Sequence, residues 1–375
     1  MIYLDNAATT APDPRVMEKI NTAMYEFGNP SSLHRLGQKA EAMLNYARQS
    51  AAWLLACDKK EIFFTSGGTL SNNIALFGAA YACRRAGNRI VSTAAEHESV
   101  LAPLKALQAQ GFEVILIAPG KDGNITAGQF EEAIDENTVL VSAMYSNNET
   151  GAVLPVKQIK NIIKNKNSKA LFHCDAVQAF GKLPMNFEAD LISVSAHKIH
   201  GCKGAGALYV KKGARINPLL FGGGQEGGIC PGTQGVPLIA GLGEACKIRK
   251  DRIDRDLKHI SELNAYLRQE LQNTGLEHHI NSPESACPYV LNFSIPGYNS
   301  ETVLHFLEEK EIFISSGAAC SSGKGSHVLK AMNLPEKLLK SAVRVSFKYD
   351  STKEEVDGLL KALKEAAERL VRAKN

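Results

Sequence analysis

The stretch ALFHCDAVQAFGKLPMNFEADLISVSAHKIHGCKGAGALYV, residues 170–210, decides the fold of this chain. It contains three short apolar or β-branched runs, beginning at Ala170, Leu191 and Gly206, and each has the length of a strand. Similar runs precede it: EIFFTS from Glu61, RIVSTA from Arg89, VILIA from Val114 and TVLVSAMY from Thr138. Amphipathic stretches such as SVLAPLKALQAQ lie between several of them, which is typical of βα units that build a mostly parallel sheet. The sequence therefore predicts an α/β fold.

The pattern changes after the glycine-rich segment FGGGQEGGICPGTQG, residues 221–235, which is incompatible with regular structure. A long helical stretch begins near Pro237 and is expected to link two domains. After about Gly275, the predicted strands YVLNFSIP, EIFISS and AVRVSFKY alternate with helices, which is typical of a smaller α+β domain. Because 375 residues exceed one average domain, two domains are expected. We predict a large α/β domain over residues 13–250 and a small α+β domain formed by residues 1–12 and 251–375.

Composition and charge exclude several classes of protein. Lys and Arg outnumber Asp and Glu by only 43 to 39, and this charge is too diffuse to indicate direct binding to nucleic acid or to a membrane. The N-terminal MIYLDNAATTAPDP lacks the features of a secretory signal, and no stretch reaches transmembrane length, so we expect a cytoplasmic protein. The eight cysteines form no CxxC pair, which disfavours a metal site and a disulfide framework and predicts reduced, packed thiols.

A candidate phosphate site follows the strand predicted from Glu61. The stretch SGGTLSNN, residues 66–73, opens an apolar helix. Its backbone N–H groups, the helix dipole and the Thr69 hydroxyl are suited to hold a phosphate dianion. A simple helix N-cap and turn explains the same residues, so this stretch alone leaves both interpretations open.

Two further stretches place reactive side chains at strand ends. In HCDAVQ, Asp175 ends a strongly apolar strand, where a carboxylate can keep a pyridinium nitrogen protonated or can simply cap a helix. In SAHKIHG, Lys198 lies one strand-plus-loop unit later, and its amine can form a Schiff base with an aldehyde cofactor. Ser195 and His197 beside it add phosphate donors. A lone lysine next to a histidine is more often a solvated surface residue, but three signals at successive strand ends favour one shared site.

These stretches resemble the cysteine desulfurases, which belong to the class V, fold-type I family of pyridoxal-phosphate enzymes and supply sulfur for iron–sulfur clusters and thiolated RNA. The resemblance runs the whole length of the chain in the family order, which makes chance similarity very improbable. It implies the fold-type I transferase-like fold. The matching stretches are YLDNAATT from Tyr3, GNPSSLHRLG from Gly28, FTSGGT from Phe64, AAEHESVL from Ala94, SNNETG from Ser146, HCDAVQ from His173, SAHKIHGCKGAGALYV from Ser195, GGGQE from Gly222, SSGAACSSG from Ser315 and AVRVSF from Ala342.

The resemblance implies roles for the residues around the cofactor ring. Lys198 would hold pyridoxal 5'-phosphate as a Schiff base, and Asp175 would pair with the ring nitrogen. Gln178 would donate a hydrogen bond to the ring oxygen, while His97 would stack on the ring and move protons. The remaining cofactor and substrate contacts follow by the same resemblance: phosphate binding by Gly68, Thr69, Ser195 and His197, completed by Thr233 across a dimer interface, and binding of the substrate carboxylate by Arg344 and Asn148, Asn148 also contacting the cofactor.

Cys320 matches the nucleophile of the family. It lies in SSGAACSSGKGS, a small-residue stretch between a predicted strand and a helix, whereas a buried thiol is the usual role of a single cysteine. The implied reaction converts L-cysteine to L-alanine and leaves a persulfide on Cys320. A homodimer would then pass the sulfur to an acceptor protein for iron–sulfur cluster assembly or for thiolation of tRNA or a cofactor.

Two alternative functions stay open at this point. Lys198, Asp175 and Arg344 serve any amino-acid substrate, so a selenocysteine lyase or another pyridoxal-phosphate-dependent C–S lyase uses the same residues. A non-catalytic protein with this fold is the alternative of another class, because arginines common in the family after GGGQE are missing. The complete set of Lys, Asp, His and Gln argues against a protein that only binds.

The sequence departs from the family pattern at three positions. Leu70 replaces a glutamate after the phosphate-binding threonine, and Gly227 and Cys230 stand where arginines are usual. Two positive charges near the expected dimer interface are therefore lost, and Cys230 is either a neutral replacement or a second sulfur-handling thiol. The Cys320 loop is also shorter than in housekeeping iron–sulfur assembly enzymes, which predicts a narrower choice of acceptor.

Overall fold

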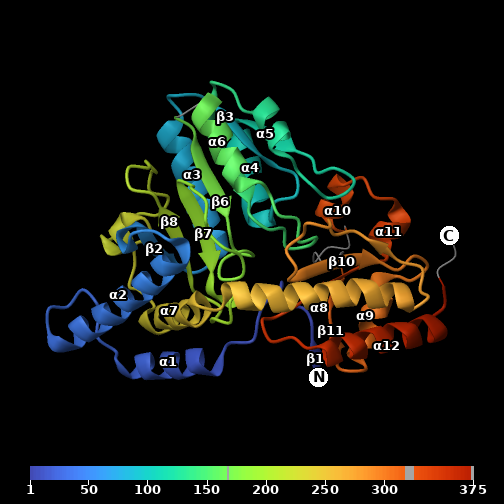
Figure 1. Cartoon of the computed structure of the whole chain (residues 1–375). Helices are drawn as coiled ribbons and strands as arrows, with labels where there is room; N and C mark the ends of the chain where they lie inside the picture. The colour runs from blue at the N-terminus through green and yellow to red at the C-terminus, as the bar shows by residue number, and fades with distance from the viewer. Residues whose placement is uncertain (167–168, 317–324, 373–375) are drawn as a thin grey trace.

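The computed structural model describes residues 1–166, 169–316 and 325–372. Figure 1 shows a large sheet flanked by helices at one side of the molecule and a smaller lobe, which carries both chain termini, at the other. The long helix α8 (Ile253–Asn273) crosses the smaller lobe.

The large sheet contains seven strands in the order β2-β8-β7-β6-β5-β3-β4 within the described residues. β8 pairs antiparallel with both of its neighbours, and the other pairs are parallel. This arrangement confirms the predicted α/β fold with a mostly parallel sheet. The strands are β2 (Ile62–Thr65), β3 (Arg89–Thr93), β4 (Glu113–Ile117), β5 (Thr138–Met144), β6 (Leu171–Asp175), β7 (Leu191–Ser195) and β8 (Gly206–Val210).

Helices cover both faces of this sheet. Successive side chains of a strand point to opposite faces, so two neighbouring residues of β5 show what packs on each face. Leu140 packs in the same core cluster as residues of α3 (Gly68–Cys83) and α4 (Glu98–Ala109), whereas its neighbour Val141 packs with residues from helices on the other side. Those helices are α1 (Pro14–Tyr25), α2 (Arg35–Leu55), α5 (Ala127–Ala133), α6 (Val156–Lys166) and α7 (Val236–Lys250). Burial on both faces explains why the strands are continuous apolar runs.

The smaller lobe is built on a four-stranded antiparallel sheet in the order β12-β13-β10-β9, within the described part of the chain. The first residues of the chain join this lobe, because β1 pairs in parallel with β11. The boundaries of two domains remain a prediction. The elements here are β1 (Ile2–Tyr3), β9 (His279–Ile280), β10 (Val290–Ser294), β11 (Ile312–Phe313), β12 (Ser315–Ser316), β13 (Ala342–Ser346), α9 (Ser300–Glu308), α10 (His327–Ala331), α11 (Glu336–Lys340) and α12 (Lys353–Arg369).

The long helical stretch expected from Pro237 is two helices. α7 ends at Lys250, and α8 starts at Ile253 after a short break. Across the break, the buried Arg249 guanidinium pairs with the buried Asp256 carboxylate at 2.6 Å and donates a further hydrogen bond to the Gly181 carbonyl oxygen at 2.8 Å. These contacts hold the turn that carries the chain from the large sheet to the smaller lobe.

All the cysteines in the described ranges are free thiols. Among these residues, no helix is long and apolar enough to cross a membrane.

Candidate active site

The residues predicted to bind the cofactor converge at the carboxyl ends of the large sheet's strands. Asp175 ends β6, and Lys198 lies in the short helical turn η2 (Ala196–Lys198) that follows β7. Gly68 opens α3 after β2, His97 precedes α4 after β3, and Asn148 follows β5. All five line one cavity of about 570 Å³, a volume suited to a small-molecule cofactor and its substrate. Ligand binding at this edge is the rule for open α/β sheets.

Lys198 is held against the N-terminal segment of the chain. Its Nζ donates hydrogen bonds to the carbonyl oxygens of Ala7 and Ala8 at 2.7 and 2.6 Å. Burial lowers the pKa of Lys198 to about 7, and the positive charges of Lys182 and Arg344 act in the same direction. A lysine with this pKa has a substantial neutral fraction near pH 7, which makes it a competent nucleophile and base.

Asp175 and His97 belong to one buried hydrogen-bond network. Asn72 Nδ2 donates to Asp175 Oδ2 and to Ser99 Oγ, both at 2.8 Å, and Ser99 Oγ lies 2.8 Å from His97 Nδ1. The Val177 amide donates to the other Asp175 oxygen at 3.0 Å. Nδ1 of His97 also accepts from the Ser99 amide, which leaves its Nε2 as the protonated nitrogen. The network fixes the orientation of the carboxylate and of the imidazole.

Burial acts in opposite directions on these two groups. It raises the pKa of the Asp175 carboxyl, while hydrogen bonds from Val177 and Asn72 oppose that rise. Burial lowers the pKa of His97, and the Asp175 charge opposes that change. A cationic ring nitrogen beside Asp175 would therefore stabilise the buried carboxylate, because a buried charge is costly unless it is paired.

The start of α3 forms an open anion site. Its N-cap residue, Gly67, has no side chain that could cap the helix, so the first backbone N–H groups of the helix are suited to bind an anionic ligand. A Cβ at Gly68 would lie 2.6 Å from Val177 Cγ2, so only glycine allows this close approach. Ser195, His197 and Thr69 line the same cavity. His197 Nδ1 lies 3.1 Å from Thr9 Oγ1, and burial lowers the pKa of this histidine to about 4.

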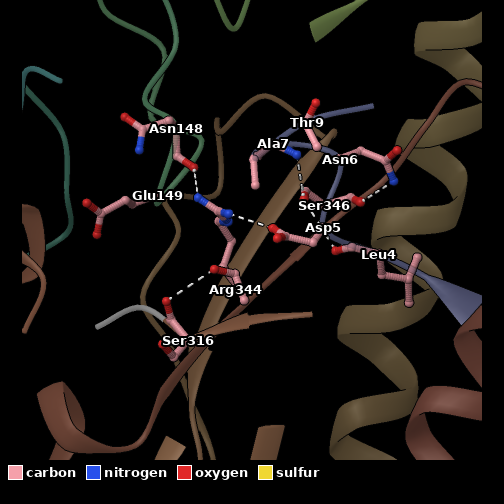
Figure 2. A network of polar contacts seen from close by, with 12 residues as sticks. Leu4, Asp5, Asn6, Ala7, Thr9, Asn148, Glu149, Ser316, Arg344 and Ser346 are labelled. Carbon is pink, nitrogen blue, oxygen red and sulfur yellow. Dashed lines mark hydrogen bonds and ion pairs between the residues drawn. The ribbon is translucent and has the colours of Figure 1, made fainter. Parts of the chain in front are cut away.

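Arg344, which belongs to β13 of the smaller lobe, lines the same cavity. Its guanidinium donates to the Asn148 carbonyl oxygen at 2.9 Å and to Asp5 Oδ1 at 2.6 Å, and Figure 2 shows both contacts. Arg344 Nε is buried and has no hydrogen-bond partner among the described residues. An orphaned buried donor on a guanidinium is costly unless a ligand satisfies it. A carboxylate fits this need, because it accepts two parallel hydrogen bonds from an arginine.

Two of the predicted site residues need separate mention. Cys320 lies outside the described residues. Thr233 is exposed and does not line the cavity of its own chain. Its predicted contact lies across a dimer interface, so it stays a prediction.

The segment that departs from the family pattern is anchored by a buried glutamate. Glu226 pairs with Arg48 through two hydrogen bonds of 2.8 Å and accepts a third from the Phe64 amide at 2.8 Å. Gly227 has a φ of 62°, a conformation that glycine adopts without strain. Burial and the charge of Glu226 raise the pKa of Cys230, which favours the unreactive thiol.

Several residues of the site were not singled out from the sequence. Asp5 lies in YLDNAATT and Asn72 in SGGTLSNN, but only the folded chain shows their contacts with Arg344 and Asp175. Glu149, next to Asn148, accepts a hydrogen bond from Ser326 Oγ, which also caps α10. The adjacent asparagines of SGGTLSNN and the glutamate of SNNETG were the available signals, because buried polar side chains need partners.

The class of the protein follows from the family comparison. The family model described as Aminotransferase class-V matches residues 2–359.

More specific relatives narrow this class. The putative cysteine desulfurase IscS 1 of Bacillus subtilis is 40% identical, with 98% of this chain and 99% of the relative covered. A solved structure titled NifS-like protein superposes with a TM-score of 0.92 at 37% identity, covering 98% of this chain and 100% of the other. A structure titled SspA in complex with cysteine has a TM-score of 0.80 at 34% identity, covering 92% and 99%. The chain therefore belongs to the class-V aminotransferase family and, within it, to the cysteine desulfurases. This result confirms the resemblance, the enzyme class and the desulfurase function predicted from the sequence.

Proposed function

We propose that this cysteine desulfurase uses pyridoxal 5'-phosphate bound to Lys198, takes L-cysteine as its substrate and collects the sulfur on Cys320. One observation carries the proposal: Lys198, Asp175, the start of α3 and Arg344 line one cavity. The complex of a 34% identical relative with cysteine supports the choice of substrate.

The residues present fit the cofactor. The N–H groups at the start of α3, with Thr69, Ser195 and His197, would hold the phosphate. Asp175 would accept a hydrogen bond from the ring nitrogen, Gln178 would donate to the ring oxygen, and His97 would lie against the ring. When bound, the cofactor supplies an electron-poor ring that draws electrons from the substrate α-carbon.

Proton transfer falls to Lys198 and substrate orientation to Arg344. Because the pKa of Lys198 is lowered to about 7, its amine can accept the α-proton of the substrate near neutral pH. Arg344 would bind the substrate carboxylate through its unpartnered Nε and a neighbouring N–H, with Asn148 next to it. The two residues would thereby orient the substrate within the cavity.

Sulfur transfer would then take place at Cys320. Its thiolate would attack the substrate sulfur, forming an S–S bond as the C–S bond breaks, and the electron pair would go to the substrate carbon. Protonation of that carbon gives alanine, and the persulfide stays on the protein. The enzyme would act as a homodimer in which Thr233 completes the phosphate site of the partner subunit. A sulfur-acceptor protein for iron–sulfur cluster assembly or for thiolation of tRNA or a cofactor would receive the sulfur.

Two substitutions test these roles separately. In Lys198→Ala, the visible absorbance of the bound cofactor and the release of alanine from cysteine should both be lost, with activity falling by more than about 10³-fold. In Cys320→Ala, the absorbance should persist while sulfide and alanine release fall by more than about 100-fold. Cys83→Ala at the end of α3 is the matched control and should behave as wild type. Cysteine turnover at the wild-type rate in Cys320→Ala would disprove the persulfide step, and unchanged absorbance in Lys198→Ala would disprove the cofactor assignment.

A further inference from the structure

A second lysine lies buried behind the active site. The chain after β6 carries first Gln178 and, four residues later, Lys182. The Lys182 side chain is only 6% exposed. No acidic side chain pairs with it within the described residues, although its Nζ lies 5.7 Å from the centre of the Tyr289 ring. An unpaired buried lysine destabilises a fold, so its presence here calls for a functional reason.

A hydrogen-bond chain joins Lys182 to Lys198. Lys182 Nζ donates to Gln178 Oε1 at 3.3 Å, and Gln178 Nε2 donates to the Ala7 carbonyl oxygen at 2.8 Å. Lys198 Nζ donates to the same Ala7 oxygen at 2.7 Å. Because a lysine ammonium has only donors, its contact requires the oxygen of the Gln178 amide to face it. The NH₂ group of Gln178 is thereby turned toward Ala7 and the cavity.

The surroundings of Lys182 are predominantly cationic. Burial has the largest effect on Lys182 and lowers its pKa to about 8. The charges of Arg249 from α7 and Arg344 from β13 also lower this pKa, whereas Cys287 before β10 raises it. Lys198 faces it across a narrow space lined also by Thr10 and Tyr289. After burial itself, the charge of Lys182 is the strongest influence that lowers the pKa of Lys198.

We propose that Lys182 is a positioning residue of the desulfurase: it fixes the Gln178 amide with its NH₂ group toward the cofactor and places a positive charge beside Lys198. The inference rests on the proposed function, in which Lys198 binds pyridoxal phosphate and Gln178 donates to the ring oxygen. Lys182 touches neither substrate nor cofactor in this arrangement. It acts through its two neighbours.

The decisive measurement is the pH titration of the visible absorbance of the Schiff base between Lys198 and pyridoxal phosphate. Lys182→Met removes the charge and the donor while preserving the length of the side chain. Without the neighbouring cation the protonated Schiff base is favoured, so the midpoint should rise by about one pH unit, a tenfold change in proton affinity. Lys182→Arg should remain within about 0.3 unit of wild type. Lys361→Met, at an exposed position on α12, is the matched control.

A double-mutant cycle tests the link through Gln178. Lys182→Met and Gln178→Leu should each weaken binding of pyridoxal phosphate, and the double variant should bind no more than about twofold more weakly than Gln178→Leu alone. Fully additive losses would overturn the positioning role. If Lys182→Met folds and its titration midpoint equals that of wild type, the electrostatic role is wrong. If thermal melting shows that Lys182→Met does not fold, the same measurement is made on Lys182→Gln.

The failure of this inference is distinguishable from failure of the proposed function. If wild type shows no visible band that Lys198→Ala removes, the proposed cofactor role fails. If that band behaves as expected but does not respond to Lys182→Met, only the inference on Lys182 fails.

Discussion

At the Lys198 end of the cavity, the functional groups come from turns that directly follow strands of one sheet. At the Arg344 end, they come from β13 and from two segments about 340 and 200 positions earlier in the chain: Arg344 contacts Asp5 and the carbonyl of Asn148, with separations of 339 and 196 residues. The first end is a property of local strand-end geometry. The second exists only once the smaller lobe and the N-terminal segment have assembled on the large sheet.

The N-terminal segment connects the two ends. The Ala7 carbonyl oxygen accepts from Lys198, while Asp5, two residues earlier, pairs with Arg344. The segment is fastened to β13, because Ser346 Oγ accepts from the Ala7 amide at 2.8 Å and Asn6 Nδ2 donates to the Ser346 carbonyl oxygen at 2.9 Å (Figure 2). A change at one end of the cavity can therefore be felt at the other.

The charges of the two ends also differ. Lys198 has no carboxylate within hydrogen-bond distance among the described residues, and its pKa is lowered to about 7. Arg344 has an acidic partner, Asp5, at 2.6 Å. The difference suits a reaction in which one end must exchange protons and the other must hold an anion. Three predictions test this contrast, in order of decreasing expected effect.

The largest effect is expected from pH acting on the Lys198 end. Only the neutral amine forms a Schiff base, and the neutral fraction of a group with a pKa near 7 falls about tenfold for each pH unit below that value. When cofactor-free protein is mixed with pyridoxal phosphate, the rate of Schiff-base formation should reach a plateau above about pH 8 and be about 100-fold lower at pH 5. Stopped-flow absorbance measures this rate.

Free Nα-acetyl-lysine is the reference reaction, because it reports the titration of the cofactor itself. The rate for the reference should continue to rise up to about pH 10, near the ordinary pKa of lysine. If the rate for the protein also climbs steeply between pH 8 and pH 10, Lys198 has an ordinary pKa, and the contrast between the two ends fails.

The same contrast explains how much of the site could be predicted from the sequence. Asp175, Lys198 and the stretch SGGTLSNN could be singled out because each lies at or just after the end of an apolar strand, and strand ends meet at one edge of the sheet. The resemblance added Arg344, but no local pattern pairs it with Asp5, because that contact depends on the packing of β13 against the N-terminus. Likewise, the apolar pattern from Pro237 does not reveal the break before Ile253, which depends on the buried pair of Arg249 and Asp256.

An intermediate effect is expected from Arg344→Lys. The substitution keeps the positive charge but removes the planar fork that binds a carboxylate through two hydrogen bonds. The loss of one charged hydrogen bond, about 1.5–3 kcal/mol, should raise KM for cysteine by roughly 10- to 150-fold. Steady-state kinetics should show a smaller change in kcat.

The exposed Arg85→Lys serves as the matched control for this substitution. The visible absorbance of the bound cofactor should match wild type in both variants, because binding of the cofactor to Lys198 does not depend on the planar guanidinium of Arg344. An unchanged KM in Arg344→Lys would show that the substrate carboxylate binds elsewhere.

The smallest effect is expected from Asp5→Asn, which tests whether the two ends communicate. Asp5 and the substrate carboxylate compete for the same guanidinium and repel each other, so removal of the Asp5 charge should lower KM for cysteine by about threefold. The charge of Asp5 also raises the pKa of Lys198, so the midpoint of the Schiff-base formation profile should move to lower pH by a few tenths of a unit. Asparagine has nearly the same shape and still accepts a hydrogen bond from Arg344, which keeps the N-terminal segment in place. If KM rises instead, Asp5 serves mainly to orient Arg344 for the substrate, and the pairing at 2.6 Å is part of the binding site rather than a competitor of the ligand.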